Sequence, residues 1–151
     1  MSLFVVVKFL HILAAIVAVG LNISYGVWIV RARRDPTHTS FALKGVKFLD
    51  DRIANPAYGF LLITGLLMVF LVPFPITTLW ILIALVLYAA LVLLALFVYT
   101  PALRQQIKLV EAGDMTSPEY LRLAQRGQVL GPALGVIVLV IVALMVFKPT
   151  L

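Results

Sequence analysis

Among the polar side chains within the long apolar stretches of this chain are four whose types could support chemistry: His11, Asn22, Thr64 and Tyr88. An imidazole can ligate a metal or a haem iron, and it can exchange a proton near neutral pH. The amide and the two hydroxyls can donate and accept hydrogen bonds. A polar group costs free energy in apolar surroundings, so each position is a candidate functional site.

Each candidate also has a purely structural interpretation. A lone histidine in an apolar helix often packs against a neighbouring helix and bonds a hydroxyl or a carbonyl group there. His11 is therefore either such a packing residue or a haem ligand or proton-handling group. Asn22 is either an interhelical hydrogen-bonding residue or a contact in a dimer. The residues alone leave these alternatives open.

Other kinds of site have little support in the sequence. Asp50 and Asp51 stand beside Arg52, and we expect a solvated face there, although adjacent carboxylates could also bind a cation or pair with Arg104. The chain has no cysteine, and its two histidines and four methionines are scattered, so we expect no soft-ligand metal site. No nucleotide-binding glycine loop, catalytic-triad pattern or zinc spacing is present.

The elements that must position these residues are four apolar runs, each about as long as a bilayer is thick. Crossing ~30 Å of hydrocarbon takes roughly 20 helical residues. The hydrophobic fraction is 64% and only 12% of the residues are charged. The sequence therefore predicts an all-α protein of one integral membrane domain, residues 1–151. We expect a four-helix transmembrane bundle, antiparallel in up-down-up-down order, with helices at about residues 3–30, 53–72, 77–100 and 129–147.

The basic residues predict how the bundle is oriented. The first loop, residues 31–52, holds six Lys or Arg, the turn near residues 73–75 holds none, and residues 101–128 hold four. Positive residues favour the cytoplasmic side. Loops 1 and 3 should therefore be cytoplasmic and both termini outside, in a multi-pass protein of the cell inner membrane. Because the positive charges sit at helix ends, the net charge of +6 does not indicate nucleic-acid binding.

Local signals predict where helices begin and bend. Apolar and charged residues mix over residues 41–51, which indicates an amphipathic segment on the inner membrane surface or an early start to the second helix. Pro56 should kink that helix, and Pro101 should end or bend the third. Ser117-Pro118 is typical of an N-cap followed by proline at the first helical position, so the fourth helix should start near Pro118.

The first helix has one face suited to packing against other helices. At 100° per residue, Ala14, Ala18, Asn22 and Gly26 share a stripe with His11, and small residues allow helices in membranes to approach closely. His11 and Thr64 each lie eight residues, roughly 12 Å, from the expected outer end of their helices. Tyr88 lies eight residues past Trp80, an expected anchor at the outer interface. These three side chains could therefore meet in one layer of the bundle.

Several short motifs resemble a known superfamily. Residues 8–13, Lys-Phe-Leu-His-Ile-Leu, with a basic cluster at residues 31–34, resemble the first helix of the HemJ-type protoporphyrinogen oxidases. Residues 55–57 and 64–66 are similar to the second helix of that family, and residues 146–149 resemble its C-terminus. The same elements recur in CopD-like copper-resistance domains and in an uncharacterised bacterial family of predicted four-helix integral membrane proteins, which fits the length and helix count best.

The resemblance implies one specific cofactor. HemJ-type proteins are taken to hold haem b through a first-helix histidine, which His11 matches, and Tyr88 and Thr64 would then be its supporting neighbours. The third helix of that family carries a basic residue needed for activity, whereas residues 77–100 have no Lys, Arg or His. This departure argues against oxidase chemistry.

We therefore expect a small binding or accessory scaffold protein of the membrane, more readily than an enzyme. The alternative is a haem-binding redox protein with His11 as axial ligand. The expected partners are the lipid bilayer and a second copy or a membrane partner subunit, without nucleic acid. A transporter ranks lowest, because transport usually needs more ionisable residues within the membrane.

Overall fold

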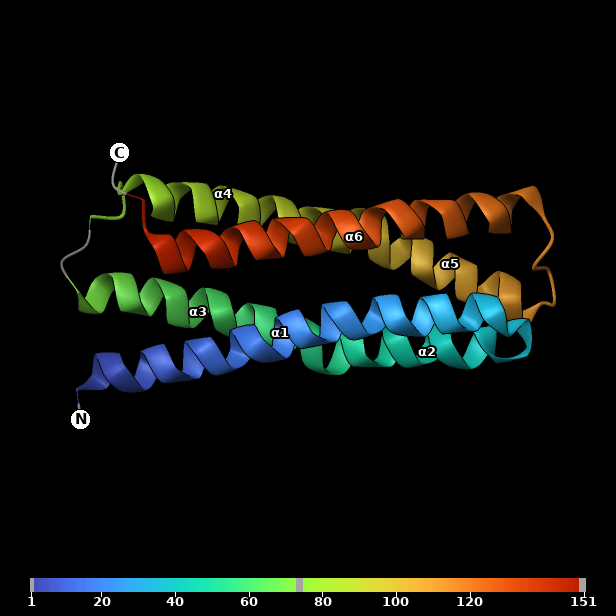
Figure 1. Ribbon diagram of the computed structural model, residues 1–151, viewed down its shortest axis with the longest axis horizontal. Coiled ribbons are helices and arrows are strands. Elements are labelled where there is room, and N and C mark those ends of the chain that lie inside the picture. The colour runs from blue at the N-terminus through green and yellow to red at the C-terminus, as the bar shows by residue number, and fades with distance from the viewer. Residues whose placement is uncertain (1, 73–74, 150–151) are drawn as a thin grey trace.

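The computed structural model describes residues 2–72 and 75–149, and these residues form long helices joined by short connections (Figure 1). No strand occurs in these two ranges. In chain order the elements are α1 (Leu3–Arg34), η1 (Pro36–His38), α2 (Thr39–Leu49), η2 (Asp50–Ala54), α3 (Asn55–Leu71), α4 (Leu79–Leu94), η3 (Ala95–Tyr99), α5 (Thr100–Glu111) and α6 (Pro118–Phe147).

Four continuous helical stretches are long and apolar enough to cross a membrane, as the apolar runs predict. They are α1, the stretch from η1 to α3, the stretch from α4 to α5, and α6. Successive stretches run back and forth along the molecule (Figure 1). The start of α1 and the end of α6 lie at one end, here named the terminal end. The α1–α2 and α5–α6 connections lie at the other, here named the loop end.

Two of these stretches contain a π-helical turn, and each turn ends two residues before a proline. η2 precedes Pro56, and η3 precedes Pro101. Proline has no N–H to donate, and its ring clashes with the carbonyl four residues earlier. A wider turn accommodates both effects without ending the helix. Pro101 therefore leaves the helix continuous, and α5 extends to Glu111.

Of the two alternatives for residues 41–51, the structure has the early start of the second helix. α2 continues through η2 into α3, and it packs against α1 and α5. Leu43 and Val46 are buried there, whereas Phe41 and Phe48 are exposed. Lys44 pairs with Glu111 at 2.5 Å and so joins α2 to α5. The segment is thus part of the bundle.

The predicted start of the fourth helix is confirmed. α6 begins at Pro118, and the Ser117 hydroxyl oxygen accepts the backbone N–H of Tyr120 at 3.2 Å. This bond satisfies one of the free N–H groups that every helix start exposes.

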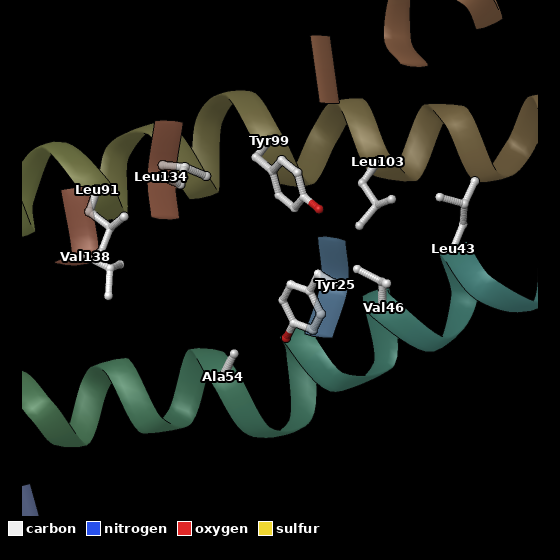
Figure 2. Packing of buried hydrophobic residues seen from close by; sticks show 9 residues of the cluster. All are labelled: Tyr25, Leu43, Val46, Ala54, Leu91, Tyr99, Leu103, Leu134 and Val138. Carbon is white, nitrogen blue, oxygen red and sulfur yellow. The ribbon is translucent and has the colours of Figure 1, made fainter. Parts of the chain in front are cut away.

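The bundle consists of two helix pairs that meet at a core nearer the loop end. α1 packs along α3, and α4 packs along α6, while α3 makes no close backbone contact with α4 or α6 within the described residues. Figure 2 shows the core from close by. Large side chains such as Phe9, Phe70 and Phe97 point outward, as a lipid-facing surface requires. The core residues are Tyr25, Leu43, Val46, Ala54, Leu91, Tyr99, Leu103, Leu134 and Val138.

Candidate functional site

His11 and Thr64 are in direct contact between α1 and α3. The His11 Nδ1 and Thr64 Oγ1 atoms are 2.8 Å apart. The Thr64 hydroxyl donates to the carbonyl of Phe60 at 2.7 Å, a bond that helical threonines often make. Because its only proton is used there, the Thr64 oxygen accepts from His11, which fixes the tautomer with hydrogen on Nδ1. The imidazole also lies over Gly65, where an added Cβ would come within 3.3 Å of Cε1.

Tyr88 takes part in a second polar layer. Its hydroxyl donates to the backbone carbonyl of Tyr58 at 2.7 Å. Asn22 donates to the Tyr58 hydroxyl and to the carbonyl of Ala18, the latter at 3.0 Å. Asn22, Tyr58 and Tyr88 therefore link α1, α3 and α4. Tyr58 precedes Thr64 by six residues, roughly 9 Å along α3, so this layer lies nearer the loop end than His11.

The small residues of the α1 stripe differ in their surroundings. Ala18 is only 1% exposed, and Ala14 is partly buried. Gly26 is exposed, and a Cβ added to it would meet no atom within 4 Å. Asn22 uses its amide within the chain, toward α3. The part of the stripe nearer the terminal end therefore packs inside the molecule, whereas Gly26 borders open space.

That open space is a cavity of about 890 Å³ between the two helix pairs. Its lining residues nearest the terminal end are apolar on three helices: Val19 on α1, Leu62 on α3 and Leu139 on α6. Polar groups line it from the middle to the loop end. They include Asn22, Tyr25, Asp50, Tyr58, Tyr88 and Tyr99.

Glycines, which have no side chain, form part of the cavity wall. Five of them line it, and a Cβ added to any of the five would meet no atom within 4 Å. The space beside these positions is therefore available to something other than the side chains of this chain. They are Gly26, Gly59, Gly127, Gly131 and Gly135.

Two groups at the polar end are incompletely satisfied. Tyr25 is 6% exposed, and its hydroxyl is buried without a hydrogen-bond partner in the described part of the chain. Asp50 is half-buried and accepts only a long bond, 3.5 Å, from the Asn55 amide. Asp50 lines the same cavity as the phenols of Tyr25, Tyr58 and Tyr99.

The cations near Asp50 have other partners. Lys47 pairs with Asp51 one turn further along the helix. Arg33, which lines the cavity, donates to the Gln128 amide oxygen at 2.9 Å when that amide is oriented to satisfy both groups. Asp51 thus behaves as the solvated face that the sequence predicts, whereas Asp50 turns toward the cavity.

The surroundings of His11 do not fit a haem held in this cavity. His11 is not among the lining residues. The second histidine, His38, lies in the exposed α1–α2 connection, where it contacts Asp35 at 2.8 Å. The described residues contain no group of three or more His, Asp or Glu side chains that could hold a metal ion. The structure thus separates the histidine from the space that could take a large ligand.

Comparison with known families agrees with this architecture. The chain matches, over residues 5–149, the family described as predicted integral membrane protein (DUF2269). The chain belongs to this family. The predicted membership of a family of uncharacterised integral membrane proteins is thereby confirmed. No curated protein and no solved structure is significantly similar to the chain.

The residues that crowd the polar end of the cavity were not predicted from the sequence. Tyr25, Tyr58 and Tyr99 are not among the candidates predicted above, although Tyr25 and Tyr99 belong to the core. One signal was available: tyrosines occur at positions 25, 58, 88 and 99, inside or at the edge of apolar runs. A phenol hydroxyl in such a place usually has a polar partner.

Proposed function

We propose that this protein is a binding protein of the membrane, which holds a small apolar or amphipathic molecule in the cavity between the helix pairs α1–α3 and α4–α6. The observation that carries the proposal is the cavity itself. Its volume, about 890 Å³, falls within the range of roughly 300–1,000 Å³ typical of small-molecule sites. An apolar wall with a few convergent polar groups is also typical of such sites.

The packing of the bundle supports entry from the lipid. Because α3 lacks close backbone contact with α4 and α6 in the described residues, no tight helix interface closes the cavity on the side of α3. The glycine wall adds space beside α3 and α6. A molecule dissolved in the bilayer could reach the cavity sideways.

A cavity-filling substitution tests this proposal. In Gly135→Leu the new side chain occupies the cavity without a Cβ clash. The matched control is Gly20→Leu, which also has open space around its Cβ but does not line the cavity. Both variants gain about 1 kcal/mol of helix propensity, so neither should fail to fold for that reason.

The readout is photo-crosslinking of purified protein in phosphatidylcholine nanodiscs with a neutral long-chain alkyl diazirine. Crosslinked residues are mapped by mass spectrometry. We expect saturable labelling of cavity-lining residues such as Tyr58 and Leu91, lost in Gly135→Leu and kept in Gly20→Leu. Labelling confined to lipid-facing residues, or equal in both variants, would show that the cavity takes no ligand.

We also propose that the loop end faces the cytoplasm of a bacterial-type inner membrane. The positive residues of the first and third loops support this orientation, since they gather toward one end of the molecule. The cysteine-free chain allows a direct test with single cysteines and a membrane-impermeant maleimide. Ser2→Cys should react in intact cells, and Thr116→Cys only after permeabilisation. The reverse pattern would invert the topology.

A further inference from the structure

We propose that the polar end of the cavity binds the protonated amine of an amphipathic organic cation, with Asp50 as its counter-ion and Tyr25 as a hydrogen-bond partner. This inference rests on the proposed function, because it names the chemical class of the molecule that the cavity holds. Charge, hydrogen bonding and shape each support it.

Asp50 has no ion-pair partner in the described part of the chain. A carboxylate in apolar surroundings is costly unless a cation or several hydrogen bonds compensate it. Within the described residues, no Lys or Arg lies within ion-pair distance of Asp50, and Lys47 is engaged by Asp51. The single long bond from Asn55 satisfies little of its acceptor capacity. A cationic ligand would supply the missing charge.

Tyr25 lacks a hydrogen-bond partner in the described part of the chain. A hydroxyl that is buried and unbonded is rare in proteins and calls for a partner. Figure 2 shows the Tyr25 hydroxyl directed toward the turn that precedes Ala54, which is the turn that carries Asp50. No hydrogen bond joins the two groups in the described part of the chain, so a donor placed between them could bond both. An ammonium has three donors, enough to reach Asp50 and the hydroxyl oxygens of Tyr25 and Tyr99.

The shape of the cavity suits an apolar body attached to the amine. Beyond the tyrosines, the cavity continues along an apolar and glycine wall toward Leu62, Val136 and Leu139. An aliphatic or aromatic body fits there, and the tyrosines around the head are the residue type that forms aromatic cages for organic cations. Arg33 also lines the polar end of the cavity, nearer the loop end than Tyr25, and it is exposed and bonded to Gln128. It forms no ion pair with Asp50 in the described part of the chain.

The test uses the same crosslinking assay with two competitors that differ only in the head group: dodecylamine and dodecanol. In wild-type protein we expect dodecylamine to displace the neutral diazirine probe at a roughly tenfold lower concentration than dodecanol. In Asp50→Asn this preference should fall to about twofold or less. In the control Asp114→Asn it should persist, because Asp114 lies in the α5–α6 connection and does not line the cavity.

The outcomes separate the two proposals. If the wild-type protein does not distinguish the amine from the alcohol, or if it prefers the alcohol, the cationic ligand is wrong while the cavity remains a binding site. If the neutral probe does not label the cavity at all, the binding function itself fails. Tyr25→Phe gives a second check, because it should weaken the amine preference by about threefold while probe labelling stays intact. An unchanged preference would remove Tyr25 from the site.

Discussion

The bond between His11 and Thr64 gives the sharpest prediction about how the bundle is held together. Thr64→Val keeps the size of the side chain but removes the acceptor, so the His11 Nδ1–H loses its partner at 2.8 Å. His11→Ala removes the bond and also the ring that packs over Gly65. Hydrogen bonds between transmembrane helices contribute about 0.6 kcal/mol on average and up to about 1.7 kcal/mol. We expect Thr64→Val to cost about 1 kcal/mol and His11→Ala about 2 kcal/mol.

The double variant isolates the pair itself. If the two side chains act through their mutual bond, the cost of the double variant should fall short of the sum by roughly 0.6–1.7 kcal/mol. The measurement is reversible unfolding in mixed micelles with increasing dodecyl sulfate, followed by tryptophan fluorescence. Gly65→Ala adds an independent check. Its Cβ would crowd the His11 ring at 3.3 Å, so it should destabilise the wild type more than the His11→Ala variant.

Additive costs would refute this reasoning. They would mean that His11 and Thr64 do not depend on each other and that the histidine has another role. If Gly65→Ala lowered the free energy of unfolding by the same amount in the wild type as in the His11→Ala background, the conclusion would be the same, because the contact between the ring and the glycine would then have no energetic effect.

Three further predictions concern separate parts of the chain. Protein purified with added haem should show no Soret band that depends on His11, because this residue does not line the cavity; a band lost in His11→Ala would contradict the separation of histidine and cavity. Ser117→Ala should destabilise the protein by about 1 kcal/mol in the same micelle assay, through loss of the α6 cap, and an unchanged midpoint would show that the cap is dispensable. The hydrogen bonds from Thr37 and then His38 lower the pKa of Asp35 below its usual 3.8. This contribution to loop stability is complete above pH 3.8 and is lost as the pH falls through the lowered pKa, so the NMR titration of Asp35 should have a midpoint below 3.8.

The helices and their number could be predicted because the membrane imposes strong and simple constraints. Backbone N–H and C=O groups in hydrocarbon must form hydrogen bonds within the protein. A helix satisfies them within one segment, so each of the four apolar runs of about 20 residues predicts a helix. The N-cap at Ser117 could also be predicted, because it depends only on Ser117 and the proline that follows it. Features that depend on one segment alone were thus accessible from the sequence.

The layer expected to contain Tyr88 shows what sequence cannot give. The prediction assumed that the end of α3 and the start of α4 lie at the same depth in the membrane. Tyr88 reaches Tyr58, which lies 13 residues before the end of α3, although Tyr88 itself is only nine residues after the start of α4. The four-residue difference shifts the start of α4 by roughly 6 Å toward the loop end. Such an offset depends on how the two helix pairs pack, and no local sequence pattern predicts it.

The environment of Asp50 was unpredictable for a related reason, which concerns rotation instead of depth. Adjacent Asp50, Asp51 and Arg52 are typical of a solvated face if the helix is regular. The structure has a π-helical turn from Asp50 to Ala54, and one extra residue in a turn rotates the preceding helix by about 100° relative to the next one. With this turn in place, α2 packs on both α1 and α5 whereas α3 packs on α1, and Asp50 lines the cavity. The proline that favours the wider turn is visible in the sequence, but which residue the turn directs inward depends on the contacts on both sides of it.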